Sequence, residues 1–458
     1  MQQKTCKLLI IGAGPGGYVC GIRAGQLGID TIVVESEKPG GTCLNVGCIP
    51  SKALIHAAEQ FETVKHAAGE NPLGISASDP VIDLGQTVDW KNGIVKRLTG
   101  GVAGLLKKSK VQVVEGTARI LDGKTVLVER DGDPLRIRCD HLVLATGSAP
   151  VELPFLPFGE TVISSTEALD LRAVPDRLAV VGAGYIGLEI GMAMAKLGSE
   201  VTLVEAADRI LPQYDAQLTA PVAARLKALG IRCLLNAKAE GLTGAGDLSV
   251  ETSGGSEDIA ADRILVTVGR RPVLDGFGVE DLGLDRTGPF LRVDELCATS
   301  MREVYAIGDI TGEPMLAHRA MAQGKLVAEH IAGLSVGWDK QAIPAVCFTD
   351  PEIVTVGQGP GEAPDAKLSL FPLQANGRAL TLERADGFVR IVSDPDSERV
   401  LGIQAVGVGV SELAGEFALA LEMAATLTDI ADTIHAHPTL GETVQEVALM
   451  GLGQALHI

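Results

Sequence analysis

The sequence predicts an α/β protein in which two Rossmann-like units, each of three layers, are followed by a C-terminal α+β unit. A glycine-rich segment at 10–17 (IIGAGPGG) returns 170 residues later at 180–187 (VVGAGYIG). Each copy is followed by a second apolar run that ends in an acidic residue, at 27–35 and at 197–205. From about residue 341 the pattern changes to shorter alternating strands, which indicates a separate α+β unit. The repeat therefore predicts two similar parallel-sheet units with two nucleotide sites.

Composition and charge narrow the possible functions. The chain has 458 residues, 46% hydrophobic and 21% charged, which suits a globular protein of several domains. Its formal net charge of −19 disfavours a nucleic-acid-binding surface. The N-terminus shows no signal or transit pattern, and no apolar run reaches membrane-spanning length. We therefore expect a cytoplasmic protein without nucleic-acid or membrane partners, whose eight cysteines form no disulfide framework.

In each copy the glycines lie between a buried strand and an Ala/Gly-rich helix, so each copy is expected to form a βαβ unit. A single G-x-G-x-x-G motif is weak in a chain with 55 glycines, and the strand–turn–helix context carries the prediction. The first glycine permits the tight turn, the second lets a pyrophosphate approach the backbone, and the third lets helix and strand pack closely. In the two copies these residues are Gly12, Gly14 and Gly17, and Gly182, Gly184 and Gly187.

An acidic residue follows the first glycine of each unit at a distance of 23 residues, as Glu35 and Glu205. A carboxylate at that position can accept hydrogen bonds from the two hydroxyls of a ribose. Glu205 would repel a 2′-phosphate, so the second unit is expected to prefer NAD to NADP, although the nearby Arg209 can soften that preference. The alternative, two strand–turn–helix units that bind nothing, leaves the duplicated acidic residues unexplained.

Later segments are expected to complete both units. LVLATGSAP (142–150) and ILVTVGRRP (264–272) are each a strand followed by glycine and proline, and they are predicted to be the last strands of the first and second units. VYAIGD (304–309) is predicted to be a further buried strand. Residues 50–110 are predicted to be helical, with a break at 69–85 that is rich in proline, glycine and aspartate.

The segment GGTCLNVGCIPSKAL (40–54) contains Cys43 and Cys48, separated by four residues. That spacing is wider than the usual redox or zinc C-x-x-C, and no second cysteine pair or His-x-x-x-His completes a zinc site. A helix that begins near these residues would lower a thiolate pKa and favour thiol–disulfide exchange, and Lys52, one turn beyond Cys48, adds positive charge. The residues favour a redox pair, while zinc ligation and a buried pair without redox function remain open.

The C-terminal unit contains the second candidate for chemistry. A strand is predicted at 388–394 (FVRIVSD) and a helix at 410–428, and the motif HAHPTLGE follows them. Thiol–disulfide exchange needs a base, and a histidine oriented by a carboxylate has a suitable pKa near neutrality. His437 precedes Pro438 and therefore lies on a turn or extended segment, where Glu442 of the following helix can reach it. A single histidine is more often a solvated or core residue, so this assignment depends on the rest of the site.

These motifs resemble those of the pyridine nucleotide–disulfide oxidoreductases, and the resemblance extends over essentially the whole chain. Within that family, GGTCLNVGCIPSKALI and HAHPTLGE are typical of the dihydrolipoamide dehydrogenase branch, although Gly441 stands where serine is more usual. Glutathione reductases tend toward Val-Pro-Lys-Lys where this chain has Ile-Pro-Ser-Lys. The segments MLAHRA (315–320) and CFTDPEIVTVG (347–357) also fit the family.

The resemblance implies two Rossmann-like FAD/NAD(P)-binding domains and a C-terminal α+β dimerisation domain. The implied boundaries are 1–149 for the FAD-binding domain, 150–272 for the NAD-binding domain, 273–340 for a central domain that completes the FAD site, and 341–458 for the dimerisation domain. The FAD-binding residues would be Gly12, Gly14, Gly17, Glu35, Lys52, Gly116, Thr146, Gly147, Asp309 on the ribityl chain, and Ala317 through its backbone. The NAD-binding residues would be Gly182, Gly184, Gly187, Glu189 near the nicotinamide, Glu205 and Gly269. No metal site is expected.

The resemblance also implies an activity, the oxidation of protein-bound dihydrolipoamide to lipoamide with reduction of NAD⁺ to NADH. Such an enzyme is the E3 component of 2-oxo acid dehydrogenase complexes, so its partners would be a lipoyl domain and the E2 acyltransferase core. Cys43 would exchange with the substrate and Cys48 would face the flavin. His437 and Glu442 of one subunit would complete the other subunit's site, which implies a homodimer with shared active sites.

Other functions are weighed against this one. A glutathione or trypanothione reductase would be expected to prefer NADPH, which Glu205 disfavours. A mercuric reductase would carry a C-terminal cysteine pair, whereas this sequence finishes with GLGQALHI. A redox-inactive flavoprotein that serves as a binding subunit would not need Cys43, Cys48 and His437, all of which are present.

Overall fold

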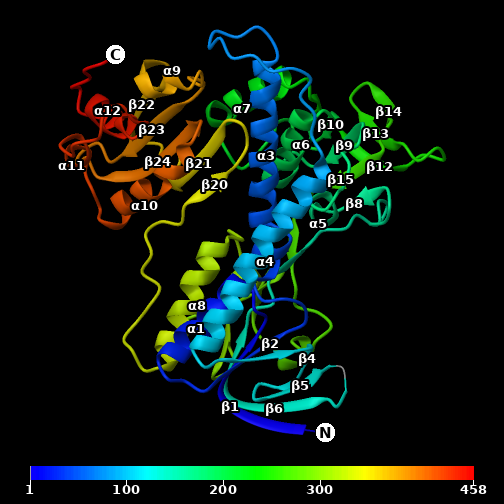
Figure 1. Ribbon diagram of the computed structural model, residues 1–458. Coiled ribbons are helices and arrows are strands. Elements are labelled where there is room, and N and C mark those ends of the chain that lie inside the picture. The colour runs from blue at the N-terminus through cyan, green and yellow to red at the C-terminus, as the bar shows by residue number, and fades with distance from the viewer. Residues whose placement is uncertain (1, 131) are drawn as a thin grey trace.

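The computed structural model describes residues 2–130 and 132–458 and arranges them in three units. The first unit forms the lower half of the molecule in Figure 1, with the N-terminus at its base. The second unit (green) and the C-terminal unit (orange and red) lie side by side above it. The predicted fold class, two α/β units and a C-terminal α+β unit, is confirmed by this arrangement.

The first unit is built on a seven-stranded sheet. Its strands are β1 (Gln2–Ile11), β2 (Thr31–Glu35), β3 (Gln112–Glu115), β4 (Thr117–Asp122), β5 (Thr125–Glu129), β6 (Leu135–Leu144) and β19 (Val304–Ala306). The order is β3-β2-β1-β6-β5-β4, and β19 pairs with the end of β6. Along β1, Leu8 and Ile10 enter one core cluster and Leu9 and Ile11 enter another, so both faces of the sheet are covered, as three layers require.

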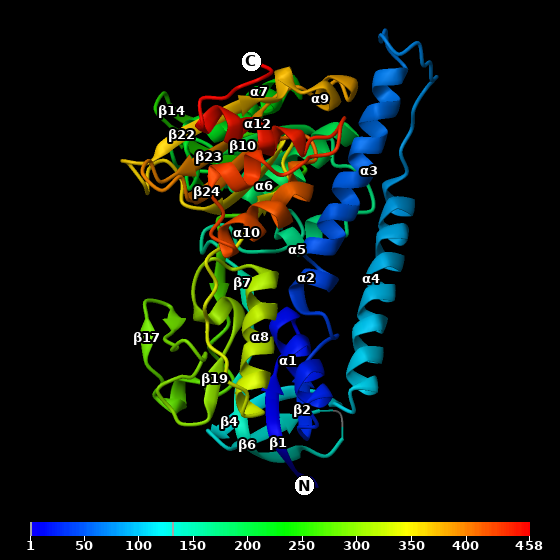
Figure 2. The same cartoon turned by 90° about the vertical axis from the view of Figure 1, so that its left-hand side faces the viewer.

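Helices cover this sheet and connect it to the second unit. They are α1 (Pro15–Gln26), α2 (Gly41–Asn45), α3 (Cys48–Ala67), α4 (Leu84–Lys108) and α8 (Ala317–Ile331). α1 and α8 pack against each other, while α3 and α4 stand as a long antiparallel pair along one side of the molecule (Figure 2). The predicted helical region at 50–110 and its break at 69–85 are confirmed by α3 and α4.

The second unit repeats the design with a five-stranded parallel sheet of order β11-β10-β9-β15-β8 and a three-stranded antiparallel sheet. The parallel strands are β8 (Val162–Ile163), β9 (Arg177–Val181), β10 (Glu200–Val204), β11 (Arg232–Leu234) and β15 (Arg263–Val266). The antiparallel strands are β12 (Lys238–Leu242), β13 (Leu248–Thr252) and β14 (Gly255–Ile259). The helices are α5 (Ser165–Ala168), α6 (Tyr185–Leu197) and α7 (Ala216–Ala228).

The segments 142–150 and 264–272 were predicted to be the last strands of the first and second units, and the structure confirms this only for the second. β15 is the last parallel strand of the second unit in chain order, as predicted. For the first unit the prediction is wrong, because the chain passes through the whole second unit and returns to add β19 beside β6. Beyond β6 and β15, the short strands β7 (Ser148–Pro150) and β16 (Arg270–Pro272) pair with each other and join the two units. The predicted domain boundary after residue 149 falls within β7, and the one after residue 272 falls directly after β16. Both boundaries remain predictions.

The C-terminal unit is a five-stranded antiparallel sheet of order β20-β21-β24-β23-β22 with helices packed on it. Its strands are β20 (Ala345–Cys347), β21 (Glu352–Gly357), β22 (Lys367–Pro372), β23 (Phe388–Ser393) and β24 (Val400–Gly407). Its helices are α9 (Gly377–Thr381), α10 (Ala414–Glu422), α11 (Leu427–Ala431) and α12 (Glu442–Gly451). The remaining short elements are β17 (Arg286–Thr287), β18 (Phe290–Leu291) and 3₁₀ turns at Glu280–Leu282, Gly308–Thr311, Leu373–Ala375 and Val410–Leu413.

The predicted strand at 388–394 is confirmed by β23, and the helical run predicted at 410–428 is confirmed except that it is divided into separate helices. A 3₁₀ turn precedes α10, and the chain then breaks before α11. Ala424 has a left-handed φ of 51°, and Thr426 caps α11 together with Asp429 in a capping box. The local cap therefore outweighs the helical periodicity of this stretch.

Close contacts at the glycine-rich turns explain the need for glycine there. Gly12 and Gly182 have φ values of 98° and 99°, a region that other residues rarely adopt. A Cβ on Gly17 would lie 1.9 Å from the carbonyl oxygen of Gly12, and the equivalent atom on Gly187 would lie 2.2 Å from that of Gly182. The third glycine of each motif therefore allows close packing of helix on strand, as predicted.

Gly17→Ala is accordingly expected to destabilise the protein by about 1–3 kcal/mol, because the new methyl group must displace backbone. The matched control is Gly93→Ala in the interior of α4, where an added Cβ meets no atom within 4 Å. There the substitution should stabilise by roughly 0.5–1 kcal/mol through helix propensity. Thermal unfolding of both variants checks the pair, and equal melting temperatures for Gly17→Ala and the parent would contradict the packing argument.

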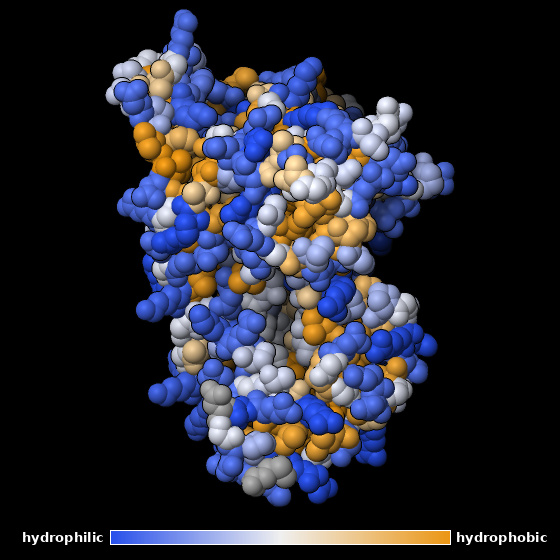
Figure 3. Space-filling view, turned by 90° about the vertical axis from the view of Figure 1, so that its right-hand side faces the viewer, coloured by the Kyte–Doolittle hydropathy of each residue, from blue (hydrophilic) through white to orange (hydrophobic). Residues whose placement is uncertain are grey.

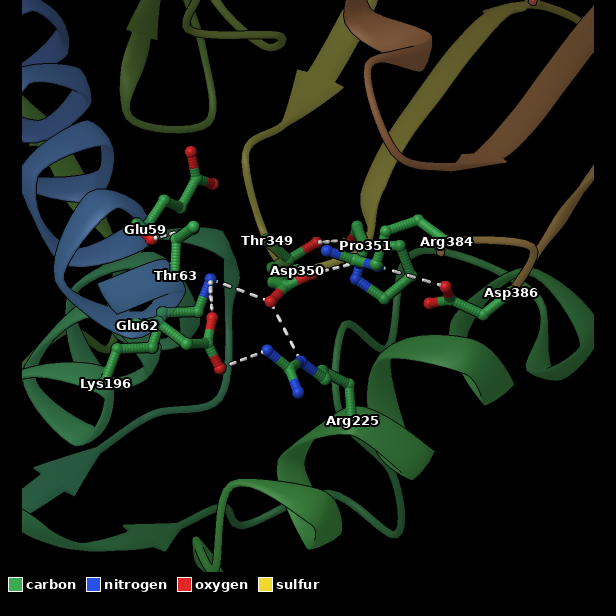
Figure 4. A network of polar contacts seen from close by, with 10 residues as sticks. All are labelled: Glu59, Glu62, Thr63, Lys196, Arg225, Thr349, Asp350, Pro351, Arg384 and Asp386. Atoms are coloured by element: carbon green, nitrogen blue, oxygen red, sulfur yellow. Dashed lines mark hydrogen bonds and ion pairs between the residues drawn. The ribbon is translucent and has the colours of Figure 1, made fainter. Parts of the chain in front are cut away.

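A buried cluster of charges fastens the three units together (Figure 4). Asp350, only 7% exposed, accepts from Lys196 Nζ at 2.7 Å and Arg225 Nε at 2.9 Å, and it also pairs with Arg384. Lys196 and Arg225 belong to α6 and α7 of the second unit, and both also contact Glu62 of α3. Burial alone raises the pKa of Asp350, but the three cations outweigh it and hold that pKa well below its usual range.

Asp350→Asn is expected to destabilise the fold by about 3–5 kcal/mol at neutral pH, because Lys196 would lose its buried carboxylate partner. Since the pKa is lowered on folding, this stability is fully present above the unfolded-state pKa of about 4 and is lost progressively as the pH falls from there through the lower folded-state pKa. Denaturant unfolding at several pH values checks both points. The exposed pair Asp89–Arg172 is the control, and Asp89→Asn should change little. A stability gap that persists unchanged below about pH 3 would contradict this account.

Hydrophilic side chains cover most of the face in Figure 3, and apolar side chains appear there in separate groups. Scattered apolar residues of this kind are normal on protein surfaces. Among the helices in residues 2–130 and 132–458, none combines the length and the apolarity that a bilayer crossing requires.

Candidate active site

A cleft of about 530 Å³ opens where the first and second units meet, and most of the predicted site residues line it. They are Gly12, Gly14, Glu35, Cys43, Cys48, Lys52, Gly116, Thr146, Gly147, Glu189, Asp309 and Ala317. Gly17 instead packs against Gly12. The other predicted residues do not line this cleft; they are Gly182, Gly184, Gly187, Glu205 and Gly269 in the second unit, and His437 and Glu442 in the C-terminal unit.

The N-termini of α1 and α6 are suited to bind phosphate. α1 has Gly14 as its N-cap, and among the described residues no side chain caps it and no acidic residue lies in its first turn. α6 begins in the same way at Gly184. Uncapped helix starts offer free N–H groups and the positive end of the helix dipole to an anion. Both therefore fit the phosphates of a dinucleotide, and glycine leaves the backbone accessible.

The two expected ribose-binding carboxylates are held by the backbone in the same manner. Glu35 accepts a hydrogen bond from Ala13 N at 2.7 Å, and Glu205 accepts one from Ala183 N at 2.7 Å. The second oxygen of each accepts from the N–H two residues further along the chain, at 3.0 and 2.8 Å. A carboxylate has about four acceptor positions, so each retains capacity for the hydroxyls of a ligand.

The cysteine pair lies at the start of a long helix, which is the condition under which the sequence favours a lowered thiolate pKa. Cys48 is the first residue of α3, and Cys43 lies on the preceding α2. A hydrogen bond from the Cys43 thiol, opposed by burial and assisted by Lys52, lowers the pKa of Cys48 to about 7. The same hydrogen bond, together with burial, raises the pKa of Cys43. Both side chains face the cleft, where a ligand can reach them.

Cys48 differs from every other cysteine in the described part of the chain. All eight are free thiols, and the other seven have raised pKa values. Apart from Cys43, the main cause is burial, which disfavours a thiolate. The residues 2–130 and 132–458 contain no group of three or more His, Cys, Asp or Glu side chains placed to hold a metal ion. Among the alternatives for this pair, the lowered pKa of Cys48 favours reactive thiols, and the redox role of Cys43 and Cys48 stays a prediction.

An ion pair crosses the cleft beside these thiols. Lys52 Nζ of α3 lies 2.8 Å from Glu189 Oε2 of α6, and Glu189 is only 4% exposed. Glu189 also accepts a hydrogen bond from the backbone N–H of Phe348 at 2.9 Å. This places the predicted FAD-site lysine against the predicted NAD-site glutamate, so the pair links the two units at the cleft.

Two side chains at the cleft were not assigned from the sequence. Arg270 Nε donates to Ser148 Oγ at 2.8 Å, and that hydroxyl donates to Asp309 Oδ2 at 2.5 Å. Tyr185 stands at the first turn of α6, and burial raises its pKa to about 12. Arg270 and Tyr185 occur within the quoted segments 264–272 and 180–187, but their role follows only from the way the units meet.

The predicted base and its carboxylate are in contact. His437 Nδ1 and Glu442 Oε1 are 2.8 Å apart, and α12 begins at Glu442 as expected. Burial raises the pKa of Glu442, but hydrogen bonds from Thr439 N–H and His437 lower it overall. The His437 side chain is 80% exposed on the C-terminal unit and does not line the cleft of its own chain. A site that needs this histidine must therefore receive it from a second subunit, which remains a prediction.

Comparison with known proteins identifies the family of this chain. Residues 6–324 match the family "Pyridine nucleotide-disulphide oxidoreductase", and residues 343–448 match its dimerisation domain, which supports a homodimer. The chain is 59% identical over 456 residues to a dihydrolipoyl dehydrogenase of Pseudomonas aeruginosa, and the alignment covers 98% of each chain. It is 48% identical to a dihydrolipoyl dehydrogenase of Haloferax volcanii, over 98% of this chain and 97% of that protein.

Solved structures lead to the same result. LpdA from Mycobacterium tuberculosis superposes with a TM-score of 0.89 at 28% sequence identity, covering 98% of this chain and 99% of LpdA. The flavoprotein disulfide reductase RclA of Escherichia coli shares the fold, with a TM-score of 0.86 at 24% identity over 96% of this chain and 99% of RclA. By its glycine turns, its cysteine pair and these full-length similarities, the chain belongs to the pyridine nucleotide-disulphide oxidoreductase family.

Proposed function

We propose that this protein oxidises protein-bound dihydrolipoamide to lipoamide and reduces NAD⁺ to NADH, as a dihydrolipoyl dehydrogenase with FAD as its flavin. The observation that carries the proposal is the pair Cys43–Cys48 at the start of α3, where Cys48 has a pKa of about 7 and lies beside Lys52 in the cleft. The names and the 59% and 48% identities of the bacterial and archaeal relatives support the choice of substrate.

The two cofactors would be held in separate regions, FAD in the cleft and NAD by residues of the second unit outside it. The α1 N-terminus and Glu35 would hold the phosphate and ribose of FAD, with Asp309 beside the ribityl chain. The α6 N-terminus and Glu205 would hold the equivalent groups of NAD. FAD, when bound, supplies two-electron transfer between the thiol pair and the nicotinamide. Arg270 would act indirectly, since it orients Asp309 through Ser148.

The thiol steps can be written from the chain's own residues. His437 of the partner subunit, oriented by its Glu442, takes the proton from one thiol of dihydrolipoamide. The thiolate attacks the Cys43 sulfur of the oxidised Cys43–Cys48 pair, so the bond between the cysteines breaks and Cys48 leaves as a thiolate. The second substrate thiol then loses its proton and attacks the substrate sulfur of the mixed disulfide. Lipoamide is released, and the Cys43 sulfur leaves as a thiolate that takes up this proton. The pair gains the two electrons that the substrate loses.

The proposal extends to partners. The C-terminal unit would form a homodimer in which each subunit supplies His437 and Glu442 to the other's thiol pair. A lipoyl domain would deliver the substrate, and an E2 acyltransferase core would hold the dimer in a 2-oxo acid dehydrogenase complex. The exposed position of His437 supports the sharing of sites between subunits.

The test is an anaerobic assay of the purified protein with NADH and lipoamide, run beside NADPH with glutathione disulfide. Rapid turnover only with NADH and lipoamide, together with a long-wavelength absorbance after two-electron reduction, is the expected result. Turnover only with NADPH and another disulfide would be consistent with the family but would contradict the proposed substrate. Bound flavin without reduction of any disulfide would instead favour a binding subunit.

A further inference from the structure

One residue of the C-terminal unit contacts both members of the Lys52–Glu189 ion pair. The backbone N–H of Phe348 donates to Glu189 Oε1 at 2.9 Å. The ring of the same residue lies under Lys52 Nζ, with 4.5 Å between the nitrogen and the ring centroid. At that distance an ammonium group is attracted by the face of an aromatic ring. The carboxylate and the ammonium are thus both held by Phe348, which itself does not line the large cleft.

The segment that carries Phe348 is fixed at two points on α6. Phe348 binds Glu189, and two residues later Asp350 binds Lys196 at 2.7 Å. Glu189 and Lys196 are seven residues apart on α6, close to two helical turns, and therefore lie on the same face. The cavity between the two anchor points measures only about 10 Å³, so the segment has little room to shift. Figure 4 shows Asp350 and its cations at the second of these points.

The position of Lys52 matters because its charge acts on Cys48. The lysine lowers the pKa of Cys48, while the neighbouring Glu189 raises it. The titratable groups that face the thiol pair come from α1, α2, α3 and α6, and they are Tyr18, Cys43, Lys52, Tyr185 and Glu189. Lys52 is the one cation that this chain places among them, and the proposed function adds His437 of the partner subunit from across the interface. The thiolate of Cys48 should therefore respond to where the Lys52 ammonium is held.

We propose that Phe348 is a positioning residue, by which the dimerisation unit holds Lys52 of its own chain beside Cys48 and so favours the reactive thiolate. Phe348 touches neither thiol and acts through Lys52 and Glu189. The consequence for turnover rests on the proposed function. The consequence for the thiol does not, since it concerns the protonation of Cys48 alone.

The experiment titrates Cys48 in the flavin-loaded dimer, in a Cys43→Ser background that leaves one thiol of the pair. The rate of alkylation by iodoacetamide is measured against pH, and the label on Cys48 is quantified by mass spectrometry. Phe348→Leu is expected to raise the pKa of Cys48 by about half a pH unit, in line with the loss of one partly exposed cation–π contact. Phe348→Tyr keeps the ring and should retain the parent value. Should the leucine variant fail to fold, Phe348→Met makes the same comparison.

Two controls separate positioning from a general structural effect. In a Lys52→Met background the shift caused by Phe348→Leu should vanish, because there is no ammonium left to position. Phe61→Leu removes another ring from beneath a lysine of α3, Lys65 at 5.7 Å, and should leave Cys48 unchanged. An unaltered Cys48 pKa in Phe348→Leu, or an equal shift with and without Lys52, overturns the proposal. Neither result depends on whether lipoamide is the substrate.

Discussion

Cys48→Ser is expected to abolish NAD-linked lipoamide turnover, lowering kcat by about 10³-fold or more. The serine hydroxyl can neither form the disulfide with Cys43 nor exist as an anion near neutral pH, where the Cys48 pKa of about 7 supplies a thiolate. Flavin should remain bound, since Cys48 is one of many residues that line the cleft. The measurement is the anaerobic steady-state rate per bound flavin.

The control for this variant is Cys233→Ser. Cys233 is a half-buried thiol on β11 that does not line the cleft, and its pKa is raised by burial. Its replacement should leave turnover near the parent value. Appreciable lipoamide turnover by Cys48→Ser would mean that electrons leave the substrate by a route that bypasses the cysteine pair, and the thiol mechanism would have to be abandoned.

His437→Gln is expected to lower kcat for lipoamide by about 10²- to 10⁴-fold, the usual contribution of a general base. Glutamine retains a polar side chain near Glu442 but cannot take a proton from the substrate thiol. The loss should diminish toward high pH, where dihydrolipoamide ionises without help. His457→Gln is the control, because His457 also pairs with a carboxylate, Glu446 at 2.6 Å, outside the proposed site.

Mixed dimers distinguish a shared site from a site within one subunit. Subunits with Cys48→Ser and subunits with His437→Gln are each expected to be inactive as homodimers. If the base acts across the interface, a mixed dimer contains one site with an intact Cys48 and an intact His437, and activity returns. Co-expression with two affinity tags isolates that dimer. Absence of any recovery would place the base in the same subunit as its thiols, contrary to the exposed position of His437 in its own chain.

The parts of the fold that follow from short stretches of sequence could be predicted. The starts of α1 and α6 follow from the glycine turns, because a positive φ at Gly12 and Gly182 and the contacts of Gly17 and Gly187 are local requirements. The place of β19 could not be predicted, since it depends on a chain that returns to the first sheet after the second unit is complete. The break near Ala424 was hidden because its capping box competes with an apolar helical pattern.

The same division applies to the site. His437 and Glu442 are five residues apart, so a turn before a helix is sufficient to bring them into contact. Arg270 meets Ser148 across 122 residues, and Phe348 meets Glu189 across 159 residues. Such contacts depend on how separate units pack, and no local spacing encodes them. Roles that act through a second residue were therefore the ones that sequence patterns could not supply.

The hydrogen bonds that Glu205 accepts from the backbone limit how the coenzyme preference of this protein can be changed. Exchanging the glutamate for a neutral side chain would remove the repulsion of a 2′-phosphate, yet it would also strip the acceptor from Ala183 N–H and from the N–H of Ala207. Each N–H group left without an acceptor lowers the stability of the fold by about 1–3 kcal/mol where water cannot replace the hydrogen bond. Glutamine keeps one amide oxygen as an acceptor, so an engineered switch should begin from an isostere and rebuild the turn around it. A substitution of Glu205 therefore changes the coenzyme preference and the stability of the surrounding loop together.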